Sequence, residues 1–160
     1  MLSADQLLDA LLERARGVTA RDTVSVSAAF GRVLAAQQTS AITVPPFDNS
    51  AMDGYAVRVA DVSRAGATLP VSQRILAGAV GAPLQPGTAA RIFTGAPVPP
   101  GADAVVMQEC CTPLPQTGEG ANAVPQQTGE GDAVIINVLP RNGENIRRAG
   151  EDIESGAPVL

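Results

Sequence analysis

Histidine, lysine and tryptophan are absent from the 160 residues of this chain, and three phenylalanines and one tyrosine are its only aromatic side chains. Without histidine, neither a Ser-His-Asp or Cys-His catalytic arrangement nor a histidine-based zinc site is available. The few aromatics and the net charge of −5 argue against a base-stacking nucleic-acid platform and against binding to a membrane surface. Any acid, base or metal ligand is therefore a carboxylate, a hydroxyl, a thiol or a backbone group.

Cysteine is also scarce, since Cys110 and Cys111 are the only two. Adjacent cysteines are sterically poor at forming a disulfide, and no second pair exists to complete a zinc site. We interpret them as half-buried thiols in a reducing cytoplasm. No run approaches the about 18–20 apolar residues of a membrane span, and the N-terminus lacks the pattern of a signal peptide. The sequence thus predicts a cytoplasmic protein that binds neither nucleic acid nor a membrane.

What is present favours a loop-rich β or mixed domain, because 45% of the residues are hydrophobic, 17% are charged, and there are 16 glycines and 13 prolines. One amphipathic helix is predicted from Ser3 to Arg16, with Ser3 and Gln6 as a capping box and Gly17 as the stop. A short helical turn is expected from a Ser27 cap through Phe30.

The rest of the chain carries β signals. Short β-branched or alternating runs, bounded by glycine, proline or aspartate, predict a small antiparallel barrel or sandwich. The predicted strands are residues 37–44, 55–59, 69–76, 90–94, 104–108 and 133–139. The pentapeptide QTGEG occurs twice, at 116–120 and 127–131. Because it lacks a lysine and P-loop glycine spacing, we interpret it as a duplicated hairpin tip.

The first candidate site is the segment PPFDNSAMDGYA at residues 45–56. It places Asp48, Asn49, Ser50 and Asp53 in a short loop, and hard cations such as Mg²⁺ prefer such oxygen ligands. A capped turn is the alternative, because Asp, Asn and Ser are favoured at N-caps and Asp53-Gly54 is a turn signal.

Two further segments carry candidate chemistry. At residues 91–103 a strand runs into Thr94-Gly95 and a stiff proline loop, which suits an oxyanion site or an ordinary strand-to-loop transition. At residues 142–153, Arg147 and Arg148 lie close to Glu151 and Asp152. Arginine binds phosphate bidentately and carboxylates hold a bridging metal, so a magnesium nucleotide or pyrophosphate is one interpretation. A surface salt-bridge cluster is the other.

Together, the segments PPFDNSAMDGYAV, RIFTGAPVPPGADAVVMQE and GENIRRAGEDI resemble the N-terminal half of the molybdopterin molybdenumtransferase family, which includes the bacterial MoeA proteins and the E domain of gephyrin. The resemblance implies an enzyme that inserts molybdate into adenylylated molybdopterin in a Mg²⁺-dependent step that releases AMP. It implies catalytic roles for Asp53, Thr94 and Asp152, with Asp53 and Asp152 also as metal ligands. The expected cofactor-binding residues are Ser50, Arg147 and Arg148.

The resemblance also implies a fold that is mainly β with an N-terminal α-helix, an elongated two-part module containing a small antiparallel β-barrel-like domain. Residues 1–20 would form a helix that packs on a later catalytic domain, and 21–45 with 141–160 a linker-like α/β subdomain. Residues 46–140 would form the barrel-like domain, with an extended loop at 112–132.

Family chains are longer, so the resemblance implies a fragment that supplies one wall of the active cleft and is inactive alone. It implies a homodimer, with a molybdopterin adenylyltransferase as the upstream partner. A non-catalytic binding or dimerisation module is an alternative of a different class. A standalone β-barrel ligand-binding protein is a third.

Overall fold

The structure is a computed structural model that describes residues 3–114 and 133–160. The chain comprises two compact units, Met1–Gln37 and Gln38–Leu160. Both copies of QTGEG, and most of the loop predicted at 112–132, lie outside the described residues. No helix in the described part of the chain is both long and apolar enough to cross a membrane.

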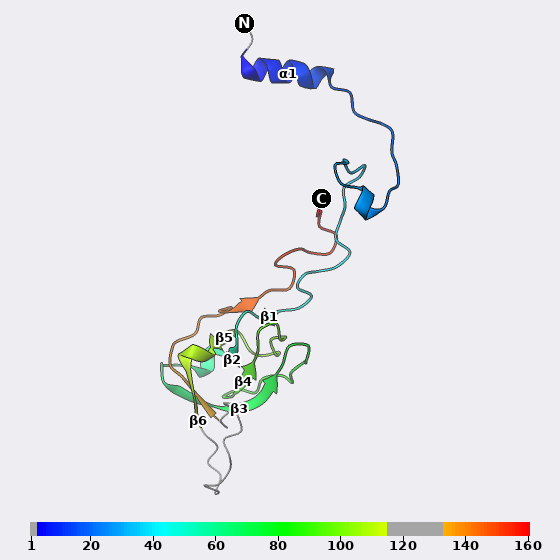
Figure 1. Cartoon of the computed structure of the whole chain (residues 1–160). Coiled ribbons are helices and arrows are strands. Elements are labelled where there is room, and N and C mark those ends of the chain that lie inside the picture. The colour runs from blue at the N-terminus through cyan, green and yellow to red at the C-terminus, as the bar shows by residue number, and fades with distance from the viewer. Residues whose placement is uncertain (1–2, 115–132) are drawn as a thin grey trace. The chain divides into compact units, whose positions relative to one another are not determined.

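The first unit contains helix α1 (Ala4–Arg14), shown in blue in Figure 1. Its predicted capping box is confirmed: the Ser3 hydroxyl accepts from the Gln6 N–H at 3.2 Å, and the Ser3 N–H donates to Gln6 Oε1 at 2.9 Å. The predicted stop at Gly17 is wrong, because the chain already turns to extended backbone at Ala15. The leucines of the apolar stripe are about half exposed; they are Leu7, Leu8, Leu11 and Leu12.

The predicted helical turn is a single 3-10 turn, η1 (Val26–Ala28). Its N-cap is Ser25 rather than the predicted Ser27, because the Ala28 N–H already bonds to the Ser25 carbonyl at 3.0 Å. The Ser27 hydroxyl pairs with that of Ser25 at 3.1 Å. Sequence spacing alone does not distinguish two serines that are two residues apart.

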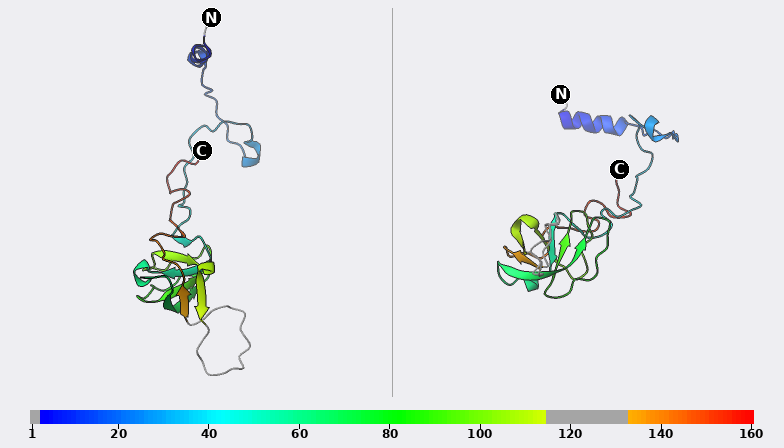
Figure 2. Two further views of the ribbon diagram at one scale, coloured as in Figure 1. Left: turned by 90° about the vertical axis from the view of Figure 1, so that its left-hand side faces the viewer. Right: turned by 60° about the horizontal axis from the view of Figure 1, so that its bottom comes forward.

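The second unit is built on a curled six-stranded sheet, a half-barrel, which confirms the mainly β prediction (Figure 1 and Figure 2). The strand order is β5-β2-β4-β3-β7-β6, and each neighbouring pair is antiparallel except the parallel β3–β4 pair. The strands are β2 (Gly54–Val57), β3 (Ala67–Ile75), β4 (Ala89–Ile92), β5 (Ala104–Met107), β6 (Cys111–Leu114) and β7 (Ala133–Ile136). The single turns η2 (Val59–Asp61) and η3 (Gln108–Cys110) follow β2 and β5.

Both faces of this sheet are covered. Tyr55 and Val57 belong to one buried cluster, whereas Ala56, between them, belongs to the other. Successive side chains of a strand point to opposite faces, so each face carries its own core. All four residues of β2 are buried. This strand therefore holds the segment that follows Asp53 rigidly in the middle of the domain.

Three parts of the chain differ from the strand predictions, and the first is β6, which was not predicted. Residues 37–44 form isolated bridges, Thr39 with Pro158 and Val44 with Ile153, rather than a strand. In addition, β1 (Asn49–Ser50) pairs with β8 (Ile146–Arg147) in a separate two-stranded sheet. A strand of two residues is too short to show a period, so this pairing has no local sequence signal.

Candidate functional site

Strand β1 brings the three sequence motifs together. On one edge, the Ser50 N–H donates to the Ala96 carbonyl at 2.9 Å, and the Gly95 N–H donates to the Ser50 carbonyl at 2.8 Å. On the other edge β1 pairs with β8, and the Ala51 N–H extends that contact to the Asn145 carbonyl at 2.9 Å. The first motif therefore lies between the second and the third, joined to both through backbone hydrogen bonds.

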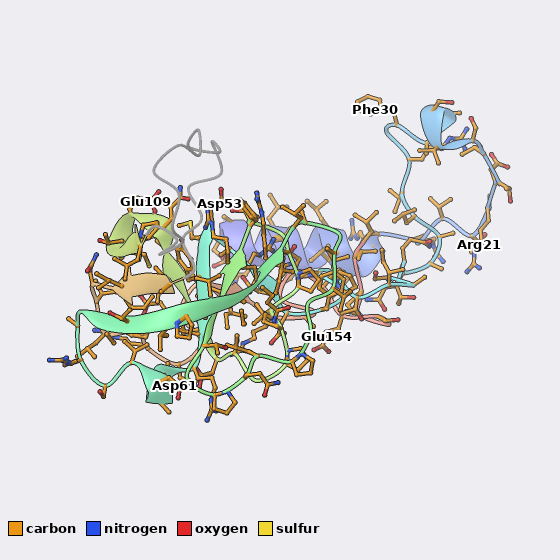
Figure 3. All side chains as sticks on the ribbon, turned by 90° about the horizontal axis from the view of Figure 1, so that it is seen from below. Arg21, Phe30, Asp53, Asp61, Glu109 and Glu154 are labelled. Carbon is orange, nitrogen blue, oxygen red and sulfur yellow. The ribbon has the colours of Figure 1, made fainter. Side chains whose placement is uncertain are left out.

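Asp53 and Thr94 form a side-chain contact between the first and second motifs. Asp53 Oδ1 accepts from both the Thr94 N–H, at 2.8 Å, and the Thr94 hydroxyl, at 2.7 Å. The Thr94 amide is the main cause of a lowered Asp53 pKa, with the hydroxyl and the charge of Arg91 acting in the same direction against partial burial. Asp53, labelled in Figure 3, is therefore an anion near neutral pH.

The sheet explains this contact. Asp53 immediately precedes β2, and Thr94 follows β4, two antiparallel neighbours in which Gly54 lies opposite Ile92. The start of one strand thus lies beside the end of the other. Gly54 permits a close approach to β5 as well, because a β-carbon there would lie 2.8 Å from the Val106 carbonyl carbon.

The third motif contributes a partly exposed ion-pair cluster. Arg147 Nη2 lies 2.6 Å from Asp152 Oδ1, and its Nε lies 3.8 Å from a carboxylate oxygen of Glu151. The hydrogen bond that Arg147 donates to Asp152, followed by the charge of that carboxylate, raises the pKa of Arg147. Arg147 therefore approaches any ligand with part of its positive charge already balanced.

Asp48 contributes to this site in a way that its sequence did not predict. The sequence placed it in the loop of the first motif and indicated no contact with the third motif. Its Oδ1 accepts from the Ala149 N–H at 2.9 Å, and its Oδ2 accepts from Arg148 Nη1 at 2.5 Å. The Ala149 amide is the main cause of a lowered Asp48 pKa, and Arg148 adds to it. The favoured N-cap chemistry of aspartate was the available signal, although the amide it binds is about a hundred residues away.

Ser50 lies within its own turn. Its side chain is buried, and its hydroxyl donates to the Met52 carbonyl at 2.5 Å and accepts from the Met52 N–H at 3.3 Å. This geometry is that of the capped turn considered above. A contact between Ser50 and a cofactor stays a prediction.

The structure does not join all the predicted site residues. Within residues 3–114 and 133–160, no hydrogen bond or ion pair links Asp152 to Asp53 or Thr94. The same residues contain no group of three or more carboxylates and thiols that could hold a metal. Mg²⁺ usually binds one or two carboxylates together with substrate phosphates and water. Single carboxylates such as Asp53 and Asp152 fit this kind of Mg²⁺ binding, in which the substrate completes the site. The metal roles of both residues stay predictions.

A family model of the MoeA N-terminal region (domain I and II) matches residues 2–160. The chain belongs to this family. Members of similar sequence include the molybdopterin molybdenumtransferase of Haemophilus influenzae, which is 38% identical over 161 residues, covering 100% of this chain and 36% of that protein. Molybdopterin molybdenumtransferase 2 of Mycobacterium tuberculosis is 43% identical over 145 residues, covering 86% of this chain and 31% of that protein.

The family fold is shared by solved structures. The molybdopterin biosynthesis MoeA protein of Pyrococcus horikoshii OT3 matches with a TM-score of 0.74 and 32% identity, over 96% of this chain and 38% of that one. The chain thus spans about a third of the length of the curated relatives that it matches. The resemblance carried by the three motifs is confirmed at the level of the family.

Proposed function

We propose that this chain is the N-terminal part of a molybdopterin molybdenumtransferase and acts in molybdenum cofactor biosynthesis. In this proposal it supplies one wall of a Mg²⁺-dependent cleft, where molybdate is inserted into adenylylated molybdopterin and AMP is released. The Asp53–Thr94 contact is the observation that carries the proposal. An ionised carboxylate, an oriented hydroxyl and two arginines on adjoining motifs are the groups that a magnesium pyrophosphate substrate requires.

The chain's own residues have distinct tasks in this proposal. Thr94 fixes Oδ1 of Asp53 through two bonds and keeps the carboxylate ionised, so that Asp53 presents negative charge toward a cation. Bound Mg²⁺ would supply positive charge against the substrate phosphates. Arg147 and Arg148, at the end of β8, orient the phosphate oxygens of the substrate. Asp152 holds the Arg147 side chain in place, and Asp48 holds that of Arg148.

The surroundings of the chain complete the proposal. A dianionic molybdate and a pyrophosphate need more cations than two paired arginines provide. We place the remaining cations on the domain that follows in the longer relatives, contributed by the second subunit of a cytoplasmic homodimer. An adenylyltransferase would supply the adenylylated substrate.

The decisive experiment uses the longer protein that contains this chain, with adenylylated molybdopterin, molybdate and Mg²⁺. Asp53→Asn should lower kcat for AMP release by about 10²-fold, because a charge-stabilising group is removed from the reacting site. Its melting temperature should fall only slightly, because the asparagine oxygen can still accept both hydrogen bonds from Thr94. Asp9→Asn, an isosteric change on exposed α1, is the matched control and should retain full activity. Full turnover by Asp53→Asn would refute the proposal.

The second candidate function is a non-catalytic binding or dimerisation module, and the half-exposed leucines of α1 favour it. The same experiment separates the two functions. If Asp53→Asn loses activity only in proportion to the fraction of protein that is unfolded, the motifs have a structural role. That result would favour the non-catalytic module over the catalytic function. Product formed by the 160-residue chain alone would contradict the view that it is only one wall of a cleft.

A further inference from the structure

Arg91 lies in β4 and holds the backbone that leads from Asp53 into β2. Its Nη1 donates to the Gly54 carbonyl at 2.8 Å, and its Nη2 donates to Gln108 Oε1 at 2.7 Å. Gly54 is the residue after Asp53 in the chain. Gln108 is joined to Asp53 directly, because its N–H donates to the Asp53 carbonyl at 3.0 Å. One guanidinium therefore connects two groups that each fix the Asp53 backbone.

Two aromatic rings set the orientation of this guanidinium. Arg91 Cζ lies 4.5 Å from the centroid of Phe93 and 5.2 Å from that of Tyr55, its cross-strand partner on β2. Both distances are within cation–π range. The side chain is half-buried and Tyr55 is buried, so the stack restricts the planar fork to one direction. Lysine would offer neither the fork nor the planar stack.

We propose that Arg91 is a positioning residue that holds Asp53 in register with Thr94. The guanidinium fixes the turn from Asp53 into β2, and Thr94 then binds the carboxylate that this turn presents. The expected effect of Arg91 on kcat rests on the proposed function. Its effect on the position of Asp53 does not, because it depends only on contacts within this chain.

Arg74 provides a matched control. It is the register partner of Arg91 in the parallel β3–β4 pair, and its Cζ lies 4.8 Å from the same Phe93 ring. The Gly54 and Gln108 bonds belong to Arg91. Arg74→Gln therefore removes one arginine charge and one contact with the Phe93 ring, and it leaves the two hydrogen bonds of Arg91 in place.

The first measurement is amide hydrogen exchange of the 160-residue chain by NMR. Arg91→Gln should speed exchange of the Thr94 and Gln108 amides at least about 10-fold, because local opening exposes both. Arg74→Gln should leave both rates unchanged. Gln108→Ala removes one of the two acceptors and should give a smaller acceleration at Thr94, which keeps the test decisive if Arg91→Gln fails to fold. Unchanged Thr94 exchange in the Arg91 and Gln108 variants, or an equal effect of Arg74→Gln, would overturn the proposal.

The second measurement is turnover by the longer protein. Arg91→Gln should lower kcat by about 10²-fold, as a displacement of about 1 Å at a reacting group does, with KM nearly unchanged. Arg91→Lys should restore little of this loss, and Arg74→Gln should match the parent protein. Rising KM at constant kcat would instead indicate a substrate contact and overturn the positioning role. If the parent protein itself shows no turnover, the proposed function fails, whereas hydrogen exchange still decides the role of Arg91.

Discussion

Replacing Gly54 with alanine is the sharpest structural test of how the fold positions Asp53. An added β-carbon would collide with the carbonyl oxygen of Val106, and it would lie 2.8 Å from the carbonyl carbon and 3.1 Å from Met107 Cα. All three obstructing atoms belong to the backbone of β5, so no side chain can rotate to make room. The two strands must separate.

The size of the effect follows from this geometry. A carbon approaches a carbonyl oxygen only to about 3.3 Å, so β5 must move outward by an amount on the order of 1 Å. Overpacking of this kind typically costs about 1–3 kcal/mol, and each kcal/mol lowers the melting temperature of a domain this size by about 2–4 °C. We expect a fall in melting temperature of about 2–12 °C. Because Asp53 adjoins Gly54, kcat of the longer protein should fall about 10²-fold.

Thermal unfolding followed by circular dichroism gives the stability, and AMP release gives the activity. Gly17→Ala is the control, since apart from its two chain neighbours no residue has an atom within 4 Å of a β-carbon at that glycine. Its free energy of unfolding should change by no more than an ordinary surface substitution does, about ±0.5 kcal/mol. If Gly54→Ala melts like the parent chain and retains full turnover, the close approach of β2 and β5 does not position the site.

Two further predictions concern ionisable groups. The lowered pKa of Asp48 means that its contacts stabilise the fold above pH 3.8, its ordinary pKa, and that this stability is lost as pH falls through the lower folded value. Asp48→Asn should therefore unfold at lower urea concentration than the parent at neutral pH, and the difference should shrink below pH 3.8; a constant difference would contradict the assignment. Burial raises the pKa of the Cys111 thiol to about 12, so iodoacetamide at about pH 8 should leave it unmodified in the folded chain and label it in urea, as mass spectrometry would show. Rapid labelling of folded Cys111 would refute its burial.

The elements that were predictable from sequence are those with local causes. The α1 start follows from Ser3 and Gln6, three residues apart. The strands of the six-stranded sheet follow from short apolar runs, except for β6, in which Pro113 interrupts the pattern. The parallel β3–β4 pair has no local signal, because both its orientation and its partner are set by packing over a distance.

The candidate site shows the same division. Residue type and motif pointed to Asp53 and Thr94, and the structure joins them by two hydrogen bonds across 41 positions of sequence. Arg91 and Asp48 received no specific role, because each acts through groups that are distant in sequence. The acceptor of Arg91 at Gly54 is 37 residues away, and the Asp48–Arg148 pair spans 100. No spacing rule reaches so far.

The 100 residues between Asp48 and Arg148 determine how long the aspartate lacks its partner during protein synthesis. A ribosome adds about 5–20 residues per second, so about 5–20 s separate the appearance of the aspartate from that of its partner. During this interval β1 has no β8 to pair with. The carboxylate of Asp48 also lacks its two donors, the Arg148 side chain and the Ala149 N–H. The six-stranded sheet, whose last strand ends at Ile136, can therefore form before the β1–β8 pair and the Asp48–Arg148 ion pair.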